Sequence, residues 1–176
     1  MLLKEEPDKY SLTTSHTTRK PRPGEVHGVH YWFIEREQFL KDLAEGKFIE
    51  HNEYNGNLYG TSYAAVEAIT KKGKTCLLDI DVNGAKKVKG SGLNARFFFI
   101  LPPGADPFET LRKRLVGRGT DSVENVERRL GIAKGELQFF KENGTFFEHV
   151  IINGDLNEAF KQWNSFLSQS QMKSKL

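Results

Sequence analysis

Thr75-Cys76-Leu77-Leu78-Asp79-Ile80-Asp81 is the stretch that indicates the fold class. Its apolar residues form a nearly continuous run, which is typical of a strand buried on both faces of a parallel sheet. Two acids close the run, and ligands of such sheets bind beyond the carboxyl ends of the strands. The stretch therefore predicts an α/β protein with a candidate site near Asp79 and Asp81.

Segments on both sides of this strand alternate between predicted strands and predicted helices. Two further apolar strands are expected at 95–101 and 147–153, and Asn55-Gly56 is a hairpin turn signal. The alternation predicts a parallel sheet with right-handed crossovers. The predicted helices are 35–45, 63–72, 108–116, 123–140 and 156–167, and the shorter predicted strands are 10–14, 31–34 and 48–50.

Composition excludes several classes of protein. The 176 residues contain 38% hydrophobic and 28% charged residues, as expected for a globular domain. Lys+Arg 26 against Asp+Glu 23 gives a net charge of only +3, so nucleic-acid binding is not indicated. The single cysteine excludes a disulfide framework within the chain, and neither a membrane-spanning run nor a signal peptide is recognisable.

The stretch Ser15–Glu25 is a candidate anion site. It reads Ser-His-Thr-Thr-Arg-Lys-Pro-Arg-Pro-Gly-Glu, with arginines at 19 and 22 and prolines at 21 and 23. Guanidinium groups suit phosphate oxygens, and prolines reduce the entropy lost when a loop becomes ordered. A solvated basic turn is the alternative interpretation of this stretch by itself.

Polar residues follow two of the predicted strands. Asp79 and Asp81 end one strand, and Asn153 ends another. The acids could hold a magnesium–phosphate group or accept hydrogen bonds from ligand N–H groups. Helix capping or a place in a solvated turn is the alternative for acids in such places.

These motifs resemble the guanylate kinase family, whose members phosphorylate GMP from ATP. The matches keep the family's order and similar spacing, and they extend over nearly the whole chain. The matching segments are Ser15–Glu25, Phe48–Glu50, Gly56–Thr61, Leu78–Asp81, Arg114–Thr120 and Val150–Asn153.

The resemblance implies one domain with a P-loop-NTPase-like parallel sheet flanked by helices, a small β-rich GMP-binding insert and a helical lid. The expected parts are a remnant of the N-terminal core at 1–13, the insert at 14–64, core at 65–109, the lid at 110–138, and core with a polar tail at 139–176.

The resemblance also implies roles for individual residues, with Mg²⁺ accompanying ATP as the cofactor and a monomer as the working state. GMP and ATP would be the substrates. The expected groups are Ser15, Arg19, Arg22, Tyr31 and Tyr59 on the GMP phosphate; Glu50, Thr61 and Asp81 on guanine; Arg114, Arg118 and Arg129 in catalysis; and Asp79 and Asn153 near the nucleotide and magnesium.

One departure from the family is the missing phosphate loop. The 176 residues contain no G-x-x-x-x-G-K-S/T motif, so the backbone cradle, the lysine and the magnesium-binding hydroxyl for ATP are not among them. The expectation is a chain, shortened or adapted, that binds GMP but transfers phosphate slowly. The alternative is a non-catalytic guanylate-kinase-like module that binds phosphopeptides in the GMP site.

The last three residues bear on localisation. Ser174-Lys175-Leu176 at a free C-terminus is a peroxisomal address. Guanylate kinases are ordinarily cytosolic. The expectation is therefore a cytoplasmic protein, or a peroxisomal one if an import receptor reads the tripeptide.

Overall fold

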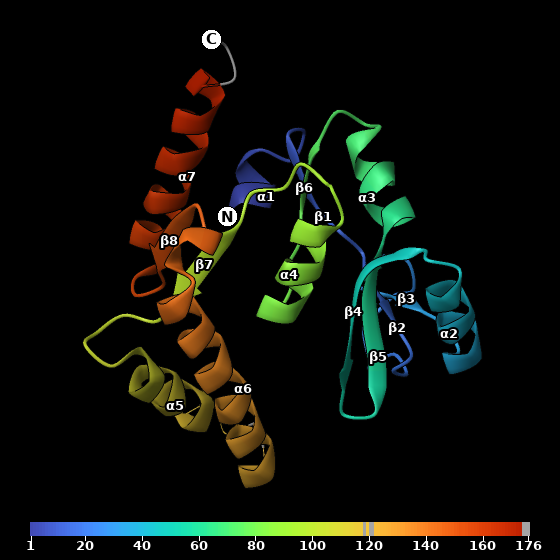
Figure 1. Ribbon diagram of the computed structural model, residues 1–176, viewed down its shortest axis with the longest axis horizontal. Coiled ribbons are helices and arrows are strands. Elements are labelled where there is room, and N and C mark those ends of the chain that lie inside the picture. Colours follow the sequence, from blue (N-terminus) through green and yellow to red (C-terminus); the bar gives the residue numbers. More distant parts are fainter. Residues whose placement is uncertain (118, 120–121, 174–176) are drawn as a thin grey trace. The chain divides into compact units, whose positions relative to one another are not determined.

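The computed structural model describes residues 1–117, 119 and 122–173. The chain divides into two compact units, Met1–Ala95 and Arg96–Leu176, and each is described by itself below. Figure 1 labels the helices and strands of both units.

The first unit contains a small parallel sheet. Strand β1 (Tyr10–Leu12) pairs in parallel with β6 (Thr75–Leu77), and helices α1 (Leu2–Glu5), α3 (Tyr63–Thr70) and α4 (Val82–Gly90) belong to the same unit. The strand expected over residues 75–81 therefore ends at Leu77. Its last residue, Asp81, instead caps α4 by accepting a hydrogen bond from the backbone N–H of Gly84.

A second, four-stranded sheet of the first unit has the order β3-β2-β5-β4. Its strands are β2 (His16–Thr17), β3 (Trp32–Phe33), β4 (Phe48–Tyr54) and β5 (Asn57–Ser62). The hairpin signal is confirmed, because Asn55 and Gly56 join β4 to β5 and both have positive φ angles, 54° and 70°. β2 was not expected: it lies inside the stretch that was predicted to be a loop.

One face of the four-stranded sheet is apolar and is covered by α2 (Arg36–Ala44). Phe39 of this helix is fully buried and stacks on Phe48 with ring centroids 4.4 Å apart. Leu58 completes the cluster. Gly60 allows the close approach, because a Cβ atom there would lie only 3.0 Å from each of the two phenyl rings.

A β-bulge turns Glu50 away from this apolar face. Phe48 pairs with Ser62 but Glu50 pairs with Thr61, so β4 has one residue more than β5 at this point. Successive residues of a strand face opposite sides of the sheet. The extra residue therefore leaves Phe48 in the apolar cluster while Glu50 faces the other side with Thr61.

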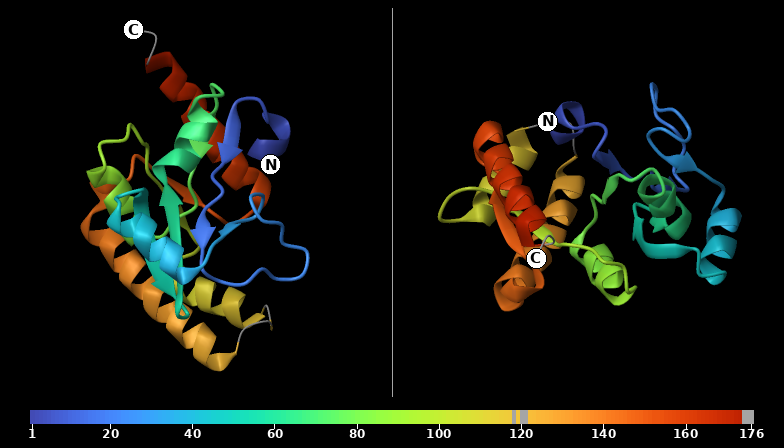
Figure 2. Two further views of the ribbon diagram at one scale, coloured as in Figure 1. Left: turned by 90° about the vertical axis from the view of Figure 1, so that its right-hand side faces the viewer. Right: turned by 90° about the horizontal axis from the view of Figure 1, so that it is seen from above.

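The described part of the second unit contains a strand pair flanked by helices. β7 (Phe98–Leu101) pairs in parallel with β8 (His149–Ile152). The chain between them forms α5 (Pro107–Gly117), α6 (Val123–Glu142) and a 3-10 turn at Gly144–Phe146, and α7 (Leu156–Lys173) follows β8. Figure 2 shows α7 beside these strands from two further sides.

Aromatic stacking and a leucine–valine seam form the core of this unit. Phe99 of β7 stacks on Phe140 of α6 at 4.5 Å, and Phe98 stacks on Trp163 of α7 at 4.6 Å. Helices α5 and α6 pack through three buried residues, Leu115, Val126 and Leu130. This helical pair is the part that the resemblance predicts to be the lid.

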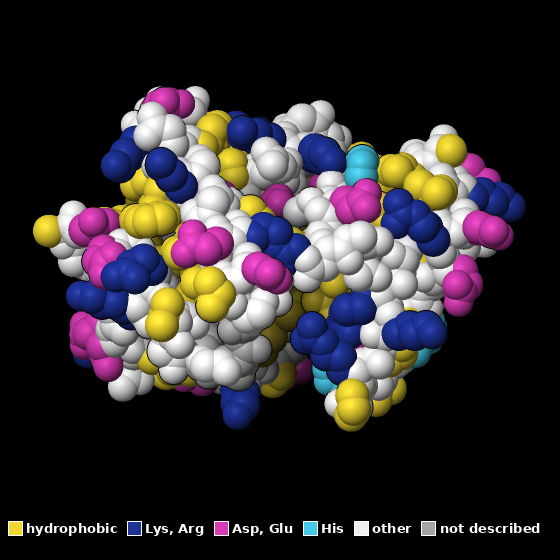
Figure 3. Space-filling model, turned by 90° about the horizontal axis from the view of Figure 1, so that it is seen from below, with side chains coloured by type: hydrophobic (Ala, Val, Ile, Leu, Met, Phe, Trp, Pro, Cys, Tyr) yellow, Lys and Arg dark blue, Asp and Glu magenta, His cyan; other side chains and the backbone are white. Residues whose placement is uncertain are grey.

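The predicted α/β class is confirmed by these parallel strand pairs with flanking helices. Within the described ranges, no helix has the length and apolarity needed to cross a membrane. Figure 3 shows acidic and basic side chains interspersed over one face of the molecule, in keeping with the small net charge.

Candidate functional site

Several predicted site residues share the face of the four-stranded sheet opposite α2, which we call the site face. Tyr59 and Thr61 lie two residues apart on β5 and so point to the same side. Their partners on β4 are Asn52 and Glu50. Leu58, which alternates with them, belongs to the apolar cluster on the other face. The strand pattern alone therefore puts an acid, an amide, a phenol and a hydroxyl on one surface.

Glu50 is the buried acid of the site face. Its exposed fraction is 6%, and Thr61 beside it is fully buried. Burial raises the pKa of Glu50, while hydrogen bonds from the Thr61 side chain and backbone lower it in part. The Ser15 hydroxyl lies 3.2 Å from the Thr61 hydroxyl. A carboxylate that is costly to bury, with hydroxyls around it, is suited to accept hydrogen bonds from a ligand.

Asp81 is held beside Glu50 by two hydrogen bonds. One carboxylate oxygen accepts from the Gly84 backbone N–H at 2.7 Å, and the other accepts from Asn52 Nδ2 at 2.5 Å. A Cβ atom at Gly84 would lie 3.1 Å from Glu50 Oε2 and 3.3 Å from Asp81 Oδ1. The glycine therefore leaves room next to both carboxylates. Asp81 therefore caps α4 and also lies next to Glu50.

Arg19 is surrounded by aromatic rings of the same unit. Its guanidinium carbon lies 5.5 Å from the Tyr31 ring centroid and 5.7 Å from that of Phe33. The Tyr59 hydroxyl hydrogen-bonds to the guanidinium, and the Tyr31 and Tyr59 rings meet edge to face at 6.1 Å. The structure thus brings a cation and two phenols together, as an anion site requires.

Glu25 is a partner of Arg19 to which the sequence interpretation gave no role. Nη1 and Nη2 of Arg19 donate to the two oxygens of Glu25 at 2.9 and 2.8 Å. The Arg22 backbone N–H donates to Oε2 at 2.7 Å. These contacts, led by the Arg19 bond, lower the pKa of Glu25 to about 2. The sequence feature that could have indicated this role is the position of Glu25, an acid in the same stretch as the two arginines and three residues after Arg22.

Three other predicted residues of the first unit lie outside the Arg19 cluster. Ser15, which is predicted to bind the phosphate, has its hydroxyl 3.2 Å from that of Thr61. The Arg22 side chain is exposed, while its backbone joins the Glu25 network. Asp79 follows β6 and is exposed. The contact of Asn52 with Asp81 was missed by the sequence interpretation, because nothing local predicts a contact between residues that lie 29 positions apart.

The predicted catalytic arginines belong to the second unit. Arg114 on α5 and Arg129 on α6 are half-buried, and each directly precedes a buried leucine of the seam, Leu115 or Leu130. Arg118 lies outside the described residues, as does the tripeptide at 174–176. Asn153 is exposed after β8, and its backbone N–H donates to the Leu101 carbonyl.

A metal held by protein side chains alone finds no support in the described ranges. No group of three or more His, Cys, Asp and Glu side chains there could hold one. Magnesium that arrives with a nucleotide needs only one or two carboxylates, since phosphate oxygens and water supply its other ligands. The exposed Asp79 carboxylate is compatible with that arrangement.

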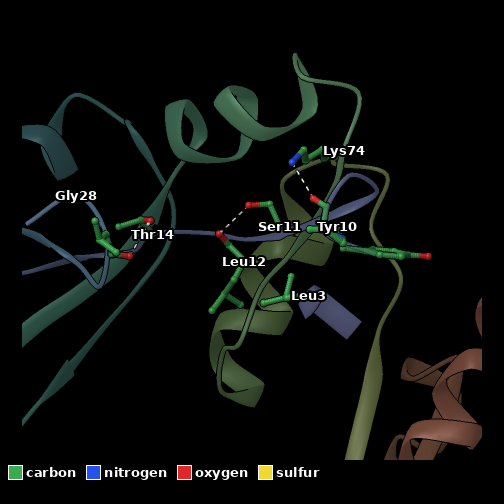
Figure 4. A pocket seen from close by; sticks show the side chains of 9 residues that line it. Leu3, Tyr10, Ser11, Leu12, Thr14, Gly28 and Lys74 are labelled. Atoms are coloured by element: carbon green, nitrogen blue, oxygen red, sulfur yellow. Dashed lines mark hydrogen bonds between the residues drawn. The ribbon is translucent and has the colours of Figure 1, made fainter. Parts of the chain in front are cut away.

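An open hollow of about 450 Å³ lies elsewhere in the first unit (Figure 4). It is lined mainly by α1, β1 and the turn at Gly28, and includes none of the predicted site residues. Three of its polar side chains are bonded to backbone carbonyls: Lys74 to Pro7, Thr14 to Val29 and Ser11 to Leu12. These three groups do not converge on a common point as the polar groups of a ligand site do.

Comparison with known proteins gives the family. The guanylate kinase family model matches residues 1–170. Guanylate kinase 1 of Oryza sativa subsp. japonica is 46% identical over 95% of this chain, and guanylate kinase of Sus scrofa is 40% identical over 98% of it. The chain spans 43% of the rice protein and 85% of the pig protein.

A solved structure agrees with this assignment. Guanylate kinase from Anaplasma phagocytophilum matches with a TM-score of 0.71 and 31% identity, over 97% of this chain and 81% of that one. The likeness extends the fold class to the P-loop-NTPase-like type. The chain therefore belongs to the guanylate kinase family.

Proposed function

We propose that this chain binds GMP on the site face and, as a guanylate kinase, transfers the γ-phosphate of ATP to it, giving GDP and ADP. The observation that carries the proposal is the layout of the site face. A buried acid lies at one end, and an arginine among phenols lies at the other, with only Gly60 between Thr61 and Tyr59.

The buried end would read the base. Glu50 can accept from the N1–H and exocyclic amine of guanine, whereas adenine offers no such pair of donors on that edge. Thr61 and Asp81 would complete the recognition, and we add Ser15 because its hydroxyl contacts Thr61. Selectivity of this kind is strong, because the wrong base would leave a buried carboxylate without partners.

The arginine end would hold the phosphate. Arg19 and the two phenols, Tyr31 and Tyr59, already meet, and the exposed Arg22 side chain lies on the same loop. Two guanidiniums and two phenols can satisfy the oxygens of a phosphate dianion.

The transfer step would use groups of the second unit. Arg114, Arg118 and Arg129 would stabilise charge on the moving phosphoryl group, and Asn153 would lie near ATP. Mg²⁺ bound with ATP neutralises phosphate charge, and Asp79 is the carboxylate we propose near it. Because the 176 residues contain no G-x-x-x-x-G-K-S/T motif, we propose that this chain transfers phosphate slowly by itself.

Calorimetric titration of GMP into the chain tests the binding site. Saturable one-site binding is expected, with no comparable binding of AMP, and with losses of at least about 100-fold in Arg19→Ala and Glu50→Ala. Glu53→Ala is the matched control, since Glu53 is an exposed acid of the same strand. If the chain is folded but does not bind GMP, the proposal is contradicted. Phosphopeptide binding would then be measured.

Localisation is a separate proposal. In a chain that ends at Leu176, Ser174-Lys175-Leu176 would direct import into peroxisomes. A fluorescent protein fused ahead of residues 168–176 should then be punctate, and deletion of the tripeptide should disperse it. A fusion that is diffuse in both forms assigns the protein to the cytoplasm.

A further inference from the structure

Glu25 holds together two parts of the arginine loop. Its carboxylate joins the Arg19 side chain to the Arg22 backbone, which lie three residues apart. The Glu25 N–H donates back to the Arg22 carbonyl at 3.0 Å, with Pro23 and Gly24 at the centre of this turn. Gly24 has a φ of +84°, which a type II turn requires at its third residue. One side chain thus fixes both the turn and the guanidinium.

The contacts of Glu25 leave the second edge of the Arg19 guanidinium turned away from the carboxylate. A guanidinium has five N–H groups. Nη1 uses both of its hydrogens, on Glu25 and on the Lys20 carbonyl, and Nη2 uses one on Glu25. The Nε–H and the second Nη2–H form the other edge, and the hydrogen bond to the Tyr59 hydroxyl lies on this edge. A phosphate that meets this edge can accept from the guanidinium and from the Tyr59 hydroxyl together.

The environment of the ion pair favours a fixed geometry. The Arg19 and Glu25 side chains are only 15% and 18% exposed. The Tyr31 and Phe33 rings lie against the guanidinium, at 5.5 and 5.7 Å from its carbon. An arginine held in this way loses less side-chain entropy when an anion arrives than a solvated arginine would.

We propose that Glu25 is a positioning residue of the phosphate end, which orients Arg19 so that its Nε/Nη2 edge, next to the Tyr59 hydroxyl, meets the phosphate of the nucleotide. The inference rests on the proposed function, because it assumes that GMP is the ligand. It differs from simple competition, in which the carboxylate would occupy the place of the phosphate. Glu25 uses the Nη1/Nη2 edge and therefore does not need to leave.

The test compares GMP with guanosine, which has the base but no phosphate. Calorimetry on Glu25→Gln should give roughly tenfold weaker GMP binding and unchanged guanosine binding. The amide has a single oxygen, and its nitrogen donates where the second carboxylate oxygen accepts. Glu25→Asp, which is too short to span both partners, should show a smaller loss of the same kind. Glu53→Gln is the control and should bind both ligands as the unmodified chain does, because the Glu53 side chain on β4 is 55% exposed.

A double-mutant cycle tests whether Glu25 acts through Arg19. In the Arg19→Ala background, Glu25→Gln should weaken GMP binding by less than about twofold. Unchanged or tighter GMP binding in the single variants overturns the proposal, and so does an equal loss of guanosine binding or a full further loss in the cycle. If the unmodified chain itself does not bind GMP, the proposed function fails instead. Circular dichroism verifies folding, and Glu25→Asp replaces Glu25→Gln if the latter is unfolded.

Discussion

Glu50 shows at the level of one residue how a binding site can oppose stability. Its pKa is raised mainly by burial, and the nearby Asp81 carboxylate contributes in the same direction. When the pKa of a carboxyl group is higher in the folded than in the unfolded chain, the free energy of unfolding decreases as the pH rises from the unfolded pKa through the folded one. Above these values Glu50 therefore costs folding free energy, and hydrogen bonds from a ligand would offset this cost.

The first prediction concerns Glu50→Gln. The amide removes the buried charge and its repulsion with Asp81, so the ligand-free chain should melt at a higher temperature. A gain of about 1 kcal/mol corresponds to roughly 2–4 °C for a chain of this size. GMP binding should fall at least about 100-fold, as argued for Glu50→Ala. Differential scanning calorimetry and titration measure the two effects. A lower melting temperature of Glu50→Gln at pH 7 would show that the Glu50 charge does not destabilise the folded chain.

The second prediction concerns His16, whose ring packs edge-on against Phe48 at 5.3 Å. Burial lowers its pKa from 6.5, and among the described residues nothing hydrogen-bonds to its buried Nδ1. The unfolded chain therefore binds a proton on His16 more readily than the folded chain does. The contribution of His16 to the free energy of unfolding should be complete above pH 6.5 and should decrease as the pH drops below it. Because of His16, this free energy should change with a slope of at most about 1.4 kcal/mol per pH unit.

Melting temperatures between pH 7.5 and 5 measure this slope. His16→Leu should flatten it, whereas His30→Gln, at an exposed histidine, should leave it as it is in the unmodified chain. The same slope in His16→Leu and in the unmodified chain would assign the pH dependence to other groups.

The β4–β5 hairpin shows at the level of elements what sequence can predict. Asn55 and Gly56 define the turn by local backbone preference alone, so the hairpin was predictable. Ser62 was likewise a predictable cap of α3, and it accepts from the Ala65 N–H at 3.1 Å. The bulge beside Glu50 was not predictable, since it depends on how the two faces of the sheet are packed.

Contacts distant in the sequence account for the other differences. Asn52 meets Asp81 only because α4 packs against β4. Leu78 and Ile80 are apolar residues of the predicted strand, yet the pairing with β1 ends at Leu77. Pairing partners, rather than local propensity, decided where this strand ended. The chemical types of the site residues were thus readable, while their mutual placement was not.

The third prediction tests the close packing of the hairpin. In Gly60→Ala, the new Cβ would lie 2.9 Å from the Glu50 carbonyl oxygen and 3.0 Å from the Phe39 and Phe48 rings. The backbone must shift, at a cost of about 1–3 kcal/mol. Gly131→Ala is the control, because open space surrounds that position on α6, and it should stabilise by up to about 1 kcal/mol. Urea unfolding measures both. Equal effects of the two changes would contradict the packing argument.

The whole molecule divides its predicted functions between two compact units. The first unit holds the residues we propose for GMP, and the second holds Arg114, Arg129 and Asn153. The four-stranded sheet lies within residues 14–64, which were predicted to be the GMP-binding insert, and α5 and α6 account for most of the predicted lid. We propose these boundaries as the functional parts of the chain.

The fourth prediction follows from this division. A ligand that binds only the folded first unit stabilises it by about 2.7 kcal/mol at 100 times its dissociation constant. GMP should therefore slow amide hydrogen exchange in β4, β5 and α4 by up to roughly 100-fold, and leave β7 and β8 nearly unchanged. Mass spectrometry of exchange with GMP, and with AMP as control, measures this. Equal protection in both units would place the GMP contacts beyond the first unit.

Strand register itself becomes a determinant of recognition at Ile49. The strand from Phe48 to Tyr54 is one residue longer than its partner requires, and this single surplus residue shifts the alternation of β4 by one step. In a ladder paired without the bulge, Ile49 would lie opposite Thr61, and Glu50 would point into the layer around Phe39. A slip of one residue in the pairing, with no amino acid changed, would thus remove from the site face the acid that we propose reads guanine.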